Sequence, residues 1–205
     1  MSAYVSLNPS TMLNPAPVVL VSCAGKGDPE KTDLVTVAWA GTVNSDPPMV
    51  SVSLRKERYS HGLISSSGEF VVNLVDEGLA KATDFCGVRS GRDLDKAKEL
   101  GLTLVKADGM EAAPRVDGAP VSLSCKVKQV LELGSHDMFL AEVAAVSVRE
   151  DLLDESGALH LEKAGLVAYS HGLYHRLGDV MGFFGWSVAR REVYEKRMAA
   201  VGGVR

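Results

Sequence analysis

The sequence predicts a mostly β protein with a closed or nearly closed antiparallel barrel. Segments rich in β-branched residues recur from residue 17 to residue 148, and the helical segments between them are short. The sustained alternation of strand and helix that a doubly wound parallel sheet requires is missing from this order. The chain has 205 residues and no internal repeat, which is enough for one sizeable core.

The first half begins with turn-rich residues 1–16, which predict an extended N-terminal arm. Strands are predicted at residues 17–23, 34–39 and 49–54, the last because valine and leucine alternate there with serine. A turn of Gly, Asn, Ser, Asp and Pro residues follows Trp39. Ser60 is predicted to cap a short helix that ends at Gly68, and a strand follows at 70–74.

In the second half, helical spacing predicts a helix at 77–86 and another at 94–100, capped by Asp93 and ended by Gly101. Two long strands are predicted at 121–133 and 138–148, joined by a turn at 134–137. A short strand at 158–161 and a C-terminal helix at 188–201, ended by Gly202-Gly203, complete the prediction.

Composition narrows the class of protein. A net charge of −4 and a pI near 5.7 argue against a nucleic-acid binder, which needs a basic face. No apolar run approaches the roughly 20 residues that cross a bilayer, and residues 1–17 do not resemble a secretory signal. The three cysteines lack the spacing of a disulfide framework or a zinc site, so we expect no metal and a reducing, cytoplasmic location.

Three short motifs resemble known functional sites, but the residues around each of them do not fit that function. Residues 25–32 lack the glycine and the following helix of a phosphate-binding loop. His171 and His175 are four apart, but Gly172 between them weakens the helix that a metal pair would need. Ser135, His136 and Asp137 are adjacent, and adjacent residues cannot form a hydrolase triad.

A cationic cluster follows the strand at 49–54 and favours an anionic ligand. Arg55 and Lys56 lie at the strand end with Arg58 close behind, and Ser60 and His61 open the next helix. Cationic side chains and the free N–H groups of a helix start are suited to a phosphate. The alternative is a solvated charged face without a ligand.

Four segments carry a family resemblance: TVAWAGTVNSDPP, SLRKERYSHGLISSSGEFVVNL, CGVRSGRDLDKAKELGL and GSHDMFLAEV. Together and in this order they resemble the flavin reductase-like family of FMN-binding split barrels, flavoredoxin-type members in particular. Ser135 and Ala141 depart from the family pattern around His136. The resemblance implies a Greek-key-like split barrel at 17–178, preceded by the arm at 1–16 and followed by a C-terminal extension at 179–205. It also implies a homodimer that binds FMN between its subunits.

The resemblance further implies which residues bind the cofactor. Residues of two strands would lie along the flavin, namely Thr36, Val37, Ala38, Trp39, Ala40, Ser53 and Leu54. Arg55, Lys56, Ser60 and His61 would hold the phosphate. A loop carrying Arg89, Ser90, Arg92 and Lys96 would fold over the phosphate or the ribityl chain.

His136 would lie near the flavin or the nicotinamide as a catalytic residue. Tyr169, Tyr174 and Trp186 would stack on the ring or line the subunit interface, and Tyr174 is the one of the three counted among the cofactor-binding residues. Plainer alternatives stay open. Trp39 could be barrel core, residues 89–96 a mobile surface loop, His136 an ordinary turn histidine, and Tyr174 a core or dimer contact.

The function that follows from the resemblance is an NAD(P)H-dependent oxidoreductase that passes electrons through FMN to free flavin or a redox protein partner. FAD is less favoured than FMN, and NADH is not distinguished from NADPH. The alternatives are a flavin-binding carrier or electron-transfer module without turnover, and a purely structural barrel.

Overall fold

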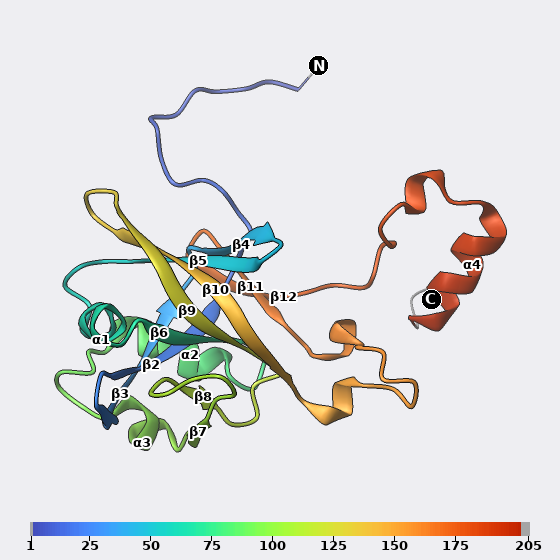
Figure 1. Cartoon of the computed structure of the whole chain (residues 1–205). Coiled ribbons are helices and arrows are strands. Elements are labelled where there is room, and N and C mark those ends of the chain that lie inside the picture. The colour runs from blue at the N-terminus through green and yellow to red at the C-terminus, as the bar shows by residue number, and fades with distance from the viewer. Residues whose placement is uncertain (1, 202–205) are drawn as a thin grey trace.

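The chain folds around a seven-stranded antiparallel sheet, which confirms the predicted mostly β split barrel (Figure 1). The computed structural model describes residues 2–201. The strands lie in the order β3-β2-β6-β9-β10-β5-β4. Their bounds are β2 Val19–Gly25, β3 Asp28–Val37, β4 Ala40–Ser45, β5 Pro48–Leu54, β6 Glu69–Leu74, β9 Val121–Glu132 and β10 Asp137–Val148.

The sheet curls back on itself because its two outermost strands are neighbours in the chain. Only Ala38 and Trp39 separate β3 from β4. The Ser53 N–H donates to the Trp39 carbonyl at 2.9 Å and ties this connection to β5. We call the junction of residues 35–39 with residues 53–55 the seam of the barrel.

Helices and two small sheets surround the barrel. The α-helices are α1 Tyr59–Ser67, α2 Ala80–Val88, α3 Lys96–Leu100 and α4 Arg191–Ala200, and single 3-10 turns occupy η1 Glu150–Leu152, η2 Leu161–Lys163 and η3 Trp186–Val188. One small sheet has the order β1-β11-β12, with bounds Ala16–Pro17, Val167–Ser170 and Leu173–Arg176; the other pairs β7 Leu104–Lys106 with β8 Pro114–Val116.

Two apolar clusters explain why β2 is buried along its whole length. Val21 faces the barrel interior, where Phe70 and Phe139 are fully buried. The adjacent Leu20 faces the opposite side and joins the cluster beneath α2 and α3. A strand covered on both faces needs a nearly continuous apolar run, which in β2 is interrupted only by the buried Ser22. Each large apolar side chain buried there contributes about 1.5–3 kcal/mol.

The turn predicted after Trp39 is wrong in its extent. Residues 40–45 form β4, which pairs with β5 from Ala40↔Val52 to Ser45↔Pro48. The reversal is confined to Asp46 and Pro47. The strand is mostly exposed and lies at the sheet edge, where polar residues that resemble a turn are tolerated.

The predicted helix starts also need correction. The N-cap of α1 is Arg58, not Ser60, and no side chain caps the helix. The Ser60 hydroxyl lies inside the first turn and donates to Asp33 instead. The helix predicted at 77–86 begins later, at Ala80. The third helix is capped by Asp95 rather than Asp93, through a bond from the Lys98 N–H. The predicted ends at Gly68 and Gly101 are confirmed, and both glycines have positive φ.

Toward the C-terminus, the strand predicted at 158–161 is wrong. Leu159 makes one isolated bridge to Leu153, and a 3-10 turn follows. The C-terminal helix is confirmed as α4 but begins at Arg191, and the predicted Gly202-Gly203 end lies outside the described residues. No helix within residues 2–201 is long and apolar enough to cross a membrane.

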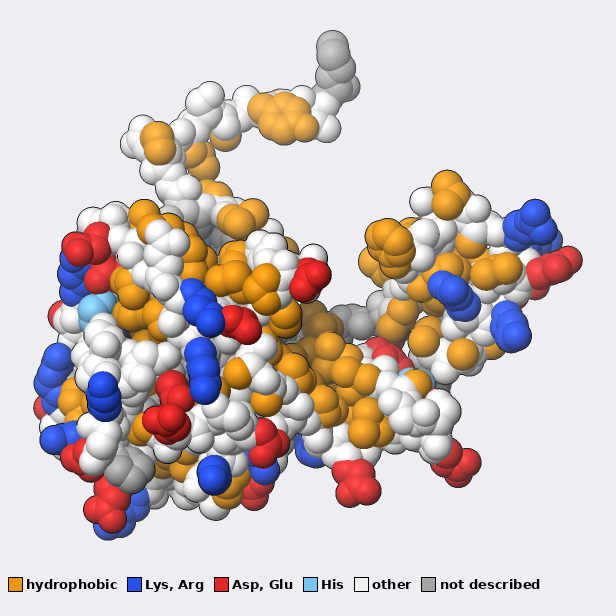
Figure 2. Space-filling model, viewed as in Figure 1, with side chains coloured by type: hydrophobic (Ala, Val, Ile, Leu, Met, Phe, Trp, Pro, Cys, Tyr) orange, Lys and Arg blue, Asp and Glu red, His pale blue; other side chains and the backbone are white. Residues whose placement is uncertain are grey.

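The two ends of the described chain leave the barrel. Residues before β1 run away from it, and α4 lies apart at the end of an extended connection (Figure 1). Apolar side chains are exposed on both segments (Figure 2). Examples are Tyr4 and Leu13 at 93% and 94% exposure and Phe184 with no measurable burial.

Candidate functional site

A cavity of about 730 Å³ lies along the seam of the barrel. Its wall includes β3, an edge strand that pairs with β2 on one side and leaves its other edge unpaired by strands. Such an edge presents backbone N–H and C=O groups to a ligand. The predicted site residues that line this cavity are Thr36, Val37, Ala38, Trp39, Ser53, Leu54, Arg55, His136 and Tyr174.

Helix α2 packs closely behind β3 at the floor of the cavity. The Thr36 hydroxyl donates to the Thr83 carbonyl, so it is already used within the protein. A Cβ added at Gly87 would lie 3.3 Å from the Thr36 Cβ, so a glycine allows this close approach. β3 is therefore held in place by α2 while its free edge faces the cavity.

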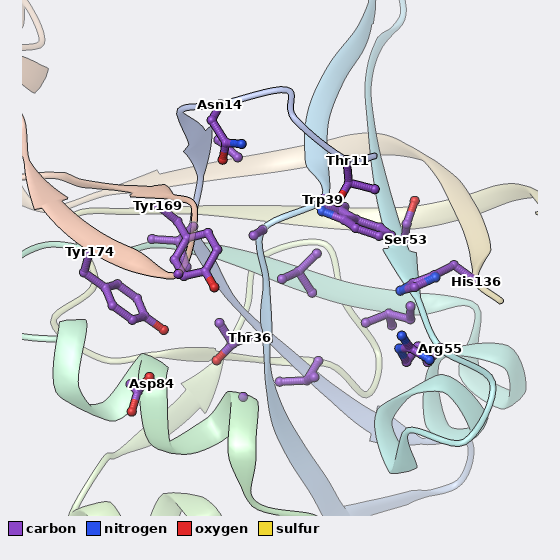
Figure 3. A pocket seen from close by; sticks show the side chains of 18 of the residues that line it. Thr11, Asn14, Thr36, Trp39, Ser53, Arg55, Asp84, His136, Tyr169 and Tyr174 are labelled. Carbon is purple, nitrogen blue, oxygen red and sulfur yellow. The ribbon is translucent and has the colours of Figure 1, made fainter. Parts of the chain in front are cut away.

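Trp39 and His136 stand together at the cavity, near Ser53 and Arg55 (Figure 3). Their ring centroids are 4.5 Å apart with an interplanar angle of 41°. Trp39 is 48% exposed, which argues against the plain core role that the sequence left open. His136 is further oriented by Ser135, whose Oγ lies 2.9 Å from the imidazole Nδ1.

The imidazole of His136 is favoured in its neutral form. Burial is the larger cause that lowers the pKa of His136, and the nearby Arg55 guanidinium lowers it further. A neutral imidazole carries both a donor and an acceptor nitrogen. His136 can therefore hold or pass a proton at the cavity near neutral pH.

A second cavity of about 530 Å³ adjoins the first, because Val35, Arg55 and Arg58 line both. Its lining is strongly cationic, with four arginines and one lysine against two carboxylates. Predicted site residues in this lining are Arg55, Ser60, Arg89, Ser90, Arg92 and Lys96. The loop at 89–92 thus faces the start of α1, as the phosphate prediction requires.

This loop is fitted closely to its neighbours. The Arg92 guanidinium lies 5.7 Å from the Tyr59 ring centroid and donates to the Glu57 carbonyl at 2.7 Å. A Cβ added at Gly91 would lie only 2.3 Å from Asp33 Oδ1. A glycine is therefore required for the loop to lie on Asp33.

Ser60 and Lys96 converge on one buried carboxylate beneath the second cavity. Lys96 Nζ lies 2.9 Å from Asp33 Oδ1, and both side chains are 2% exposed. Lys96 also donates to the Leu34 carbonyl, and Ser60 donates to Asp33 Oδ2. These two side chains are occupied within the protein, so their arrangement favours positioning of the loop and of α1.

Lys56 and His61 lie outside the lining of both cavities, as does Ala40. Lys56 Nζ lies 2.6 Å from a Glu132 oxygen and 3.4 Å from Asp137, and His61 Nε2 lies 2.8 Å from Asp137. Burial would raise the pKa of Asp137, but its bonds to His61 and Lys56 outweigh burial and lower that pKa. The two predicted phosphate ligands are thus engaged with carboxylates.

Sequence reasoning did not select several residues that line the first cavity. Arg58 belongs to the cationic run and could have been included on that ground. Tyr169, which the sequence offered for stacking on the ring, lines the cavity from β11. Asp84 on α2 and, in the N-terminal segment, Thr11, Leu13 and Asn14 line it without having been predicted. Their sequence positions carry no comparable signal, because only the folded topology places these elements beside the seam.

Comparison with known proteins places the chain in a family. The sequence profile described as "Flavin reductase like domain" matches residues 11–178. The structure of flavoredoxin from Desulfovibrio vulgaris (Miyazaki F) superposes with a TM-score of 0.83 at 28% identity, covering 91% of this chain and all of that one. An FMN-binding protein from Thermus thermophilus superposes with a TM-score of 0.71 at 27% identity, covering 86% of this chain and 96% of the other.

A curated relative with a named activity is the NADH-dependent FMN reductase RutF of Stutzerimonas stutzeri. It is 25% identical over 109 residues, which are 53% of this chain and 60% of that protein. The alignments with the first two curated relatives cover 66% and 59% of those proteins.

Proposed function

The chain belongs to the flavin reductase-like domain family, and on that premise we propose that it is an FMN-dependent oxidoreductase. Electrons from NAD(P)H would pass through FMN to free flavin or to a redox protein. The observation that carries the proposal is the cationic cavity that adjoins the seam cavity at Arg55 and Arg58. A phosphate and an attached flat ring system need such a pair of compartments.

The residues present fit FMN on two grounds. The second cavity has an excess of guanidinium groups, which bind phosphate oxygens through paired N–H donors. The first cavity has a size typical of small-molecule sites, a half-exposed indole and a free strand edge. The cationic lining holds the anionic end, and β3 offers donors to the ring edge.

FMN supplies the two-electron chemistry when it is bound, and the protein supplies position and electrostatics. Arg55, Arg58 and Arg89 fix the phosphate end in the second cavity. The half-exposed Trp39 would lie beside the ring and limit its access to water. The neutral His136 beside it is placed to exchange a proton at its free ring nitrogen.

The test begins with the visible absorption spectrum of the purified protein, with and without added FMN. Steady oxidation of NADH or NADPH in the presence of free flavin would support the oxidoreductase. A yellow protein without turnover would instead identify a flavin carrier. A colourless protein that takes up neither FMN nor FAD would refute the proposal.

We also propose a homodimer, which the family resemblance implies. The exposed apolar side chains of the N-terminal segment and of residues 181–188 support it, because large apolar surfaces commonly mark interaction sites (Figure 2). Light scattering that gives the mass of one 21.8 kDa chain would refute it. A cytoplasmic location is proposed on the three cysteines, which are all buried and unpaired.

A further inference from the structure

The seam cavity has opposite charges at its two ends. Arg55 lies at one end together with His136, while Asp84 and Tyr174 lie at the other (Figure 3). Asp84 is the one carboxylate among the described residues that line this cavity, and Arg55 and Arg58 are its guanidinium groups. A ligand phosphate is therefore favoured at the arginine end and repelled at the Asp84 end.

Two tyrosine rings form a wall beside Asp84. Tyr169 on β11 and Tyr174 on β12 are directly paired across the hairpin. Their ring centroids are 5.3 Å apart at an interplanar angle of 72°. The hairpin turn at His171 and Gly172, both with positive φ, also lies in the cavity lining and sets this pairing.

The Tyr174 hydroxyl points toward Asp84 (Figure 3). Burial raises the pKa of Tyr174 to about 12, and the Asp84 carboxylate contributes as a charge and as a hydrogen-bond acceptor. The phenol therefore stays protonated near neutral pH. The carboxylate stays close to the aromatic wall, and its charge adds to the negative potential of the ring faces.

A carboxylate beside two aromatic rings has a defined ligand preference. Electron-rich ring faces attract cations, and a carboxylate accepts from N–H groups while attracting positive charge. A flat, positively charged heterocycle with a carboxamide would satisfy all three side chains. The dinucleotide product of an NAD(P)H-dependent reaction carries such a pyridinium ring.

We propose that Asp84, Tyr169 and Tyr174 form a subsite for the pyridinium carboxamide ring of the oxidised nicotinamide dinucleotide. The proposal rests on the proposed function and adds residues that favour the charged ring over its neutral form. The ring occupies the cavity end opposite Arg55, away from the phosphate-binding arginines. Asp84 determines specificity there, because its carboxylate favours the positively charged ring over the neutral one.

The experiment compares two probes that differ mainly in ring charge, 1-methylnicotinamide as the cation and nicotinamide as the neutral ring. Calorimetric titration of the FMN-loaded protein should show tighter binding of the cation. Asp84→Asn should reduce the ratio of the two affinities by about threefold to tenfold. Tyr174→Phe keeps the ring and should retain most of the preference, whereas Tyr174→Leu should weaken binding of the cation.

The matched control is Glu155→Gln, which removes an exposed carboxylate outside the cavity lining and makes the same change in net charge. It should leave the ratio unchanged. Equal affinity for the two probes, binding of neither, or the same ratio in native protein and Asp84→Asn would overturn the subsite. The absorption spectrum of the same sample reports FMN, so failure of the proposed function is distinguished from failure of the subsite alone.

Discussion

Replacing Arg55 by alanine tests the phosphate assignment most sharply among single substitutions. Arg55 lines both cavities, so its guanidinium lies where the ring compartment meets the cationic one. A hydrogen bond to a charged group contributes about 1.5–3 kcal/mol. The Arg55 side chain is 53% exposed and lies 3.6 Å from Glu57, so we expect the lower end of that range.

A loss of about 1.5 kcal/mol corresponds to roughly tenfold weaker FMN binding. The assay is a fluorescence titration of Arg55→Ala with FMN and, in parallel, with riboflavin, which lacks the phosphate. Riboflavin affinity should hardly change, and the salt dependence of FMN binding should become shallower. Arg191→Ala is the control, because Arg191 is 89% exposed and pairs with Glu195 on α4, far along the chain from the site.

The reasoning would be refuted if Arg55→Ala bound FMN as tightly as the native protein did. Equal weakening of FMN and riboflavin would also refute it, because the arginine would then act on the ring compartment rather than on the phosphate.

The remaining predictions concern the loop, the buried ion pair and the imidazole. Gly91→Ala should weaken FMN binding severalfold and lower Tm, because the added Cβ would collide with the Asp33 carboxylate. The control is Gly62→Ala, whose Cβ would lie in open space, and it should leave both the FMN titration and the melting temperature unchanged. Lys96→Met should cost about 3–5 kcal/mol in urea unfolding by leaving the Asp33 carboxylate buried without a cation, and adding Asp33→Asn should restore part of it. The lowered pKa of His136 means that the unfolded chain binds its proton first as pH falls below about 6.5. The stability contributed by the neutral imidazole is therefore present above that pH and lost below it, and His136→Gln should flatten this part of the stability–pH curve; an unchanged curve would contradict the assignment.

The sequence indicated the barrel through patterns that local chemistry controls. The alternation of Val50 and Val52 with serines predicted β5, and Gly68 and Gly101 predicted helix ends through their tolerance of positive φ. The strand β4 was missed because an exposed edge strand has no apolar periodicity to detect. Ser60 was misjudged as a cap because its partner, Asp33, is distant in sequence.

The residues of the candidate site also fall into those that local sequence could identify and those that only the tertiary fold brings together. Trp39 and Arg55 could be selected because motif order and charge clustering mark them locally. Lys56 and His61 belong to the same cationic motif, but both side chains pair with Asp137 on β10 and lie outside the lining of the two cavities. Tyr169 could be named from its aromatic-rich segment, and it does line the cavity. Asp84 could not be selected, because it reaches the cavity only through the packing of α2 beside the seam.

The most direct measurement is a crystal structure of the protein grown with excess FMN. The account predicts the phosphate among Arg55, Arg58 and the loop at 89–92, with the ring system along β3 near Trp39. Phosphate density elsewhere, or a cationic cavity closed by the protein's own side chains while flavin binds at another place, would contradict it.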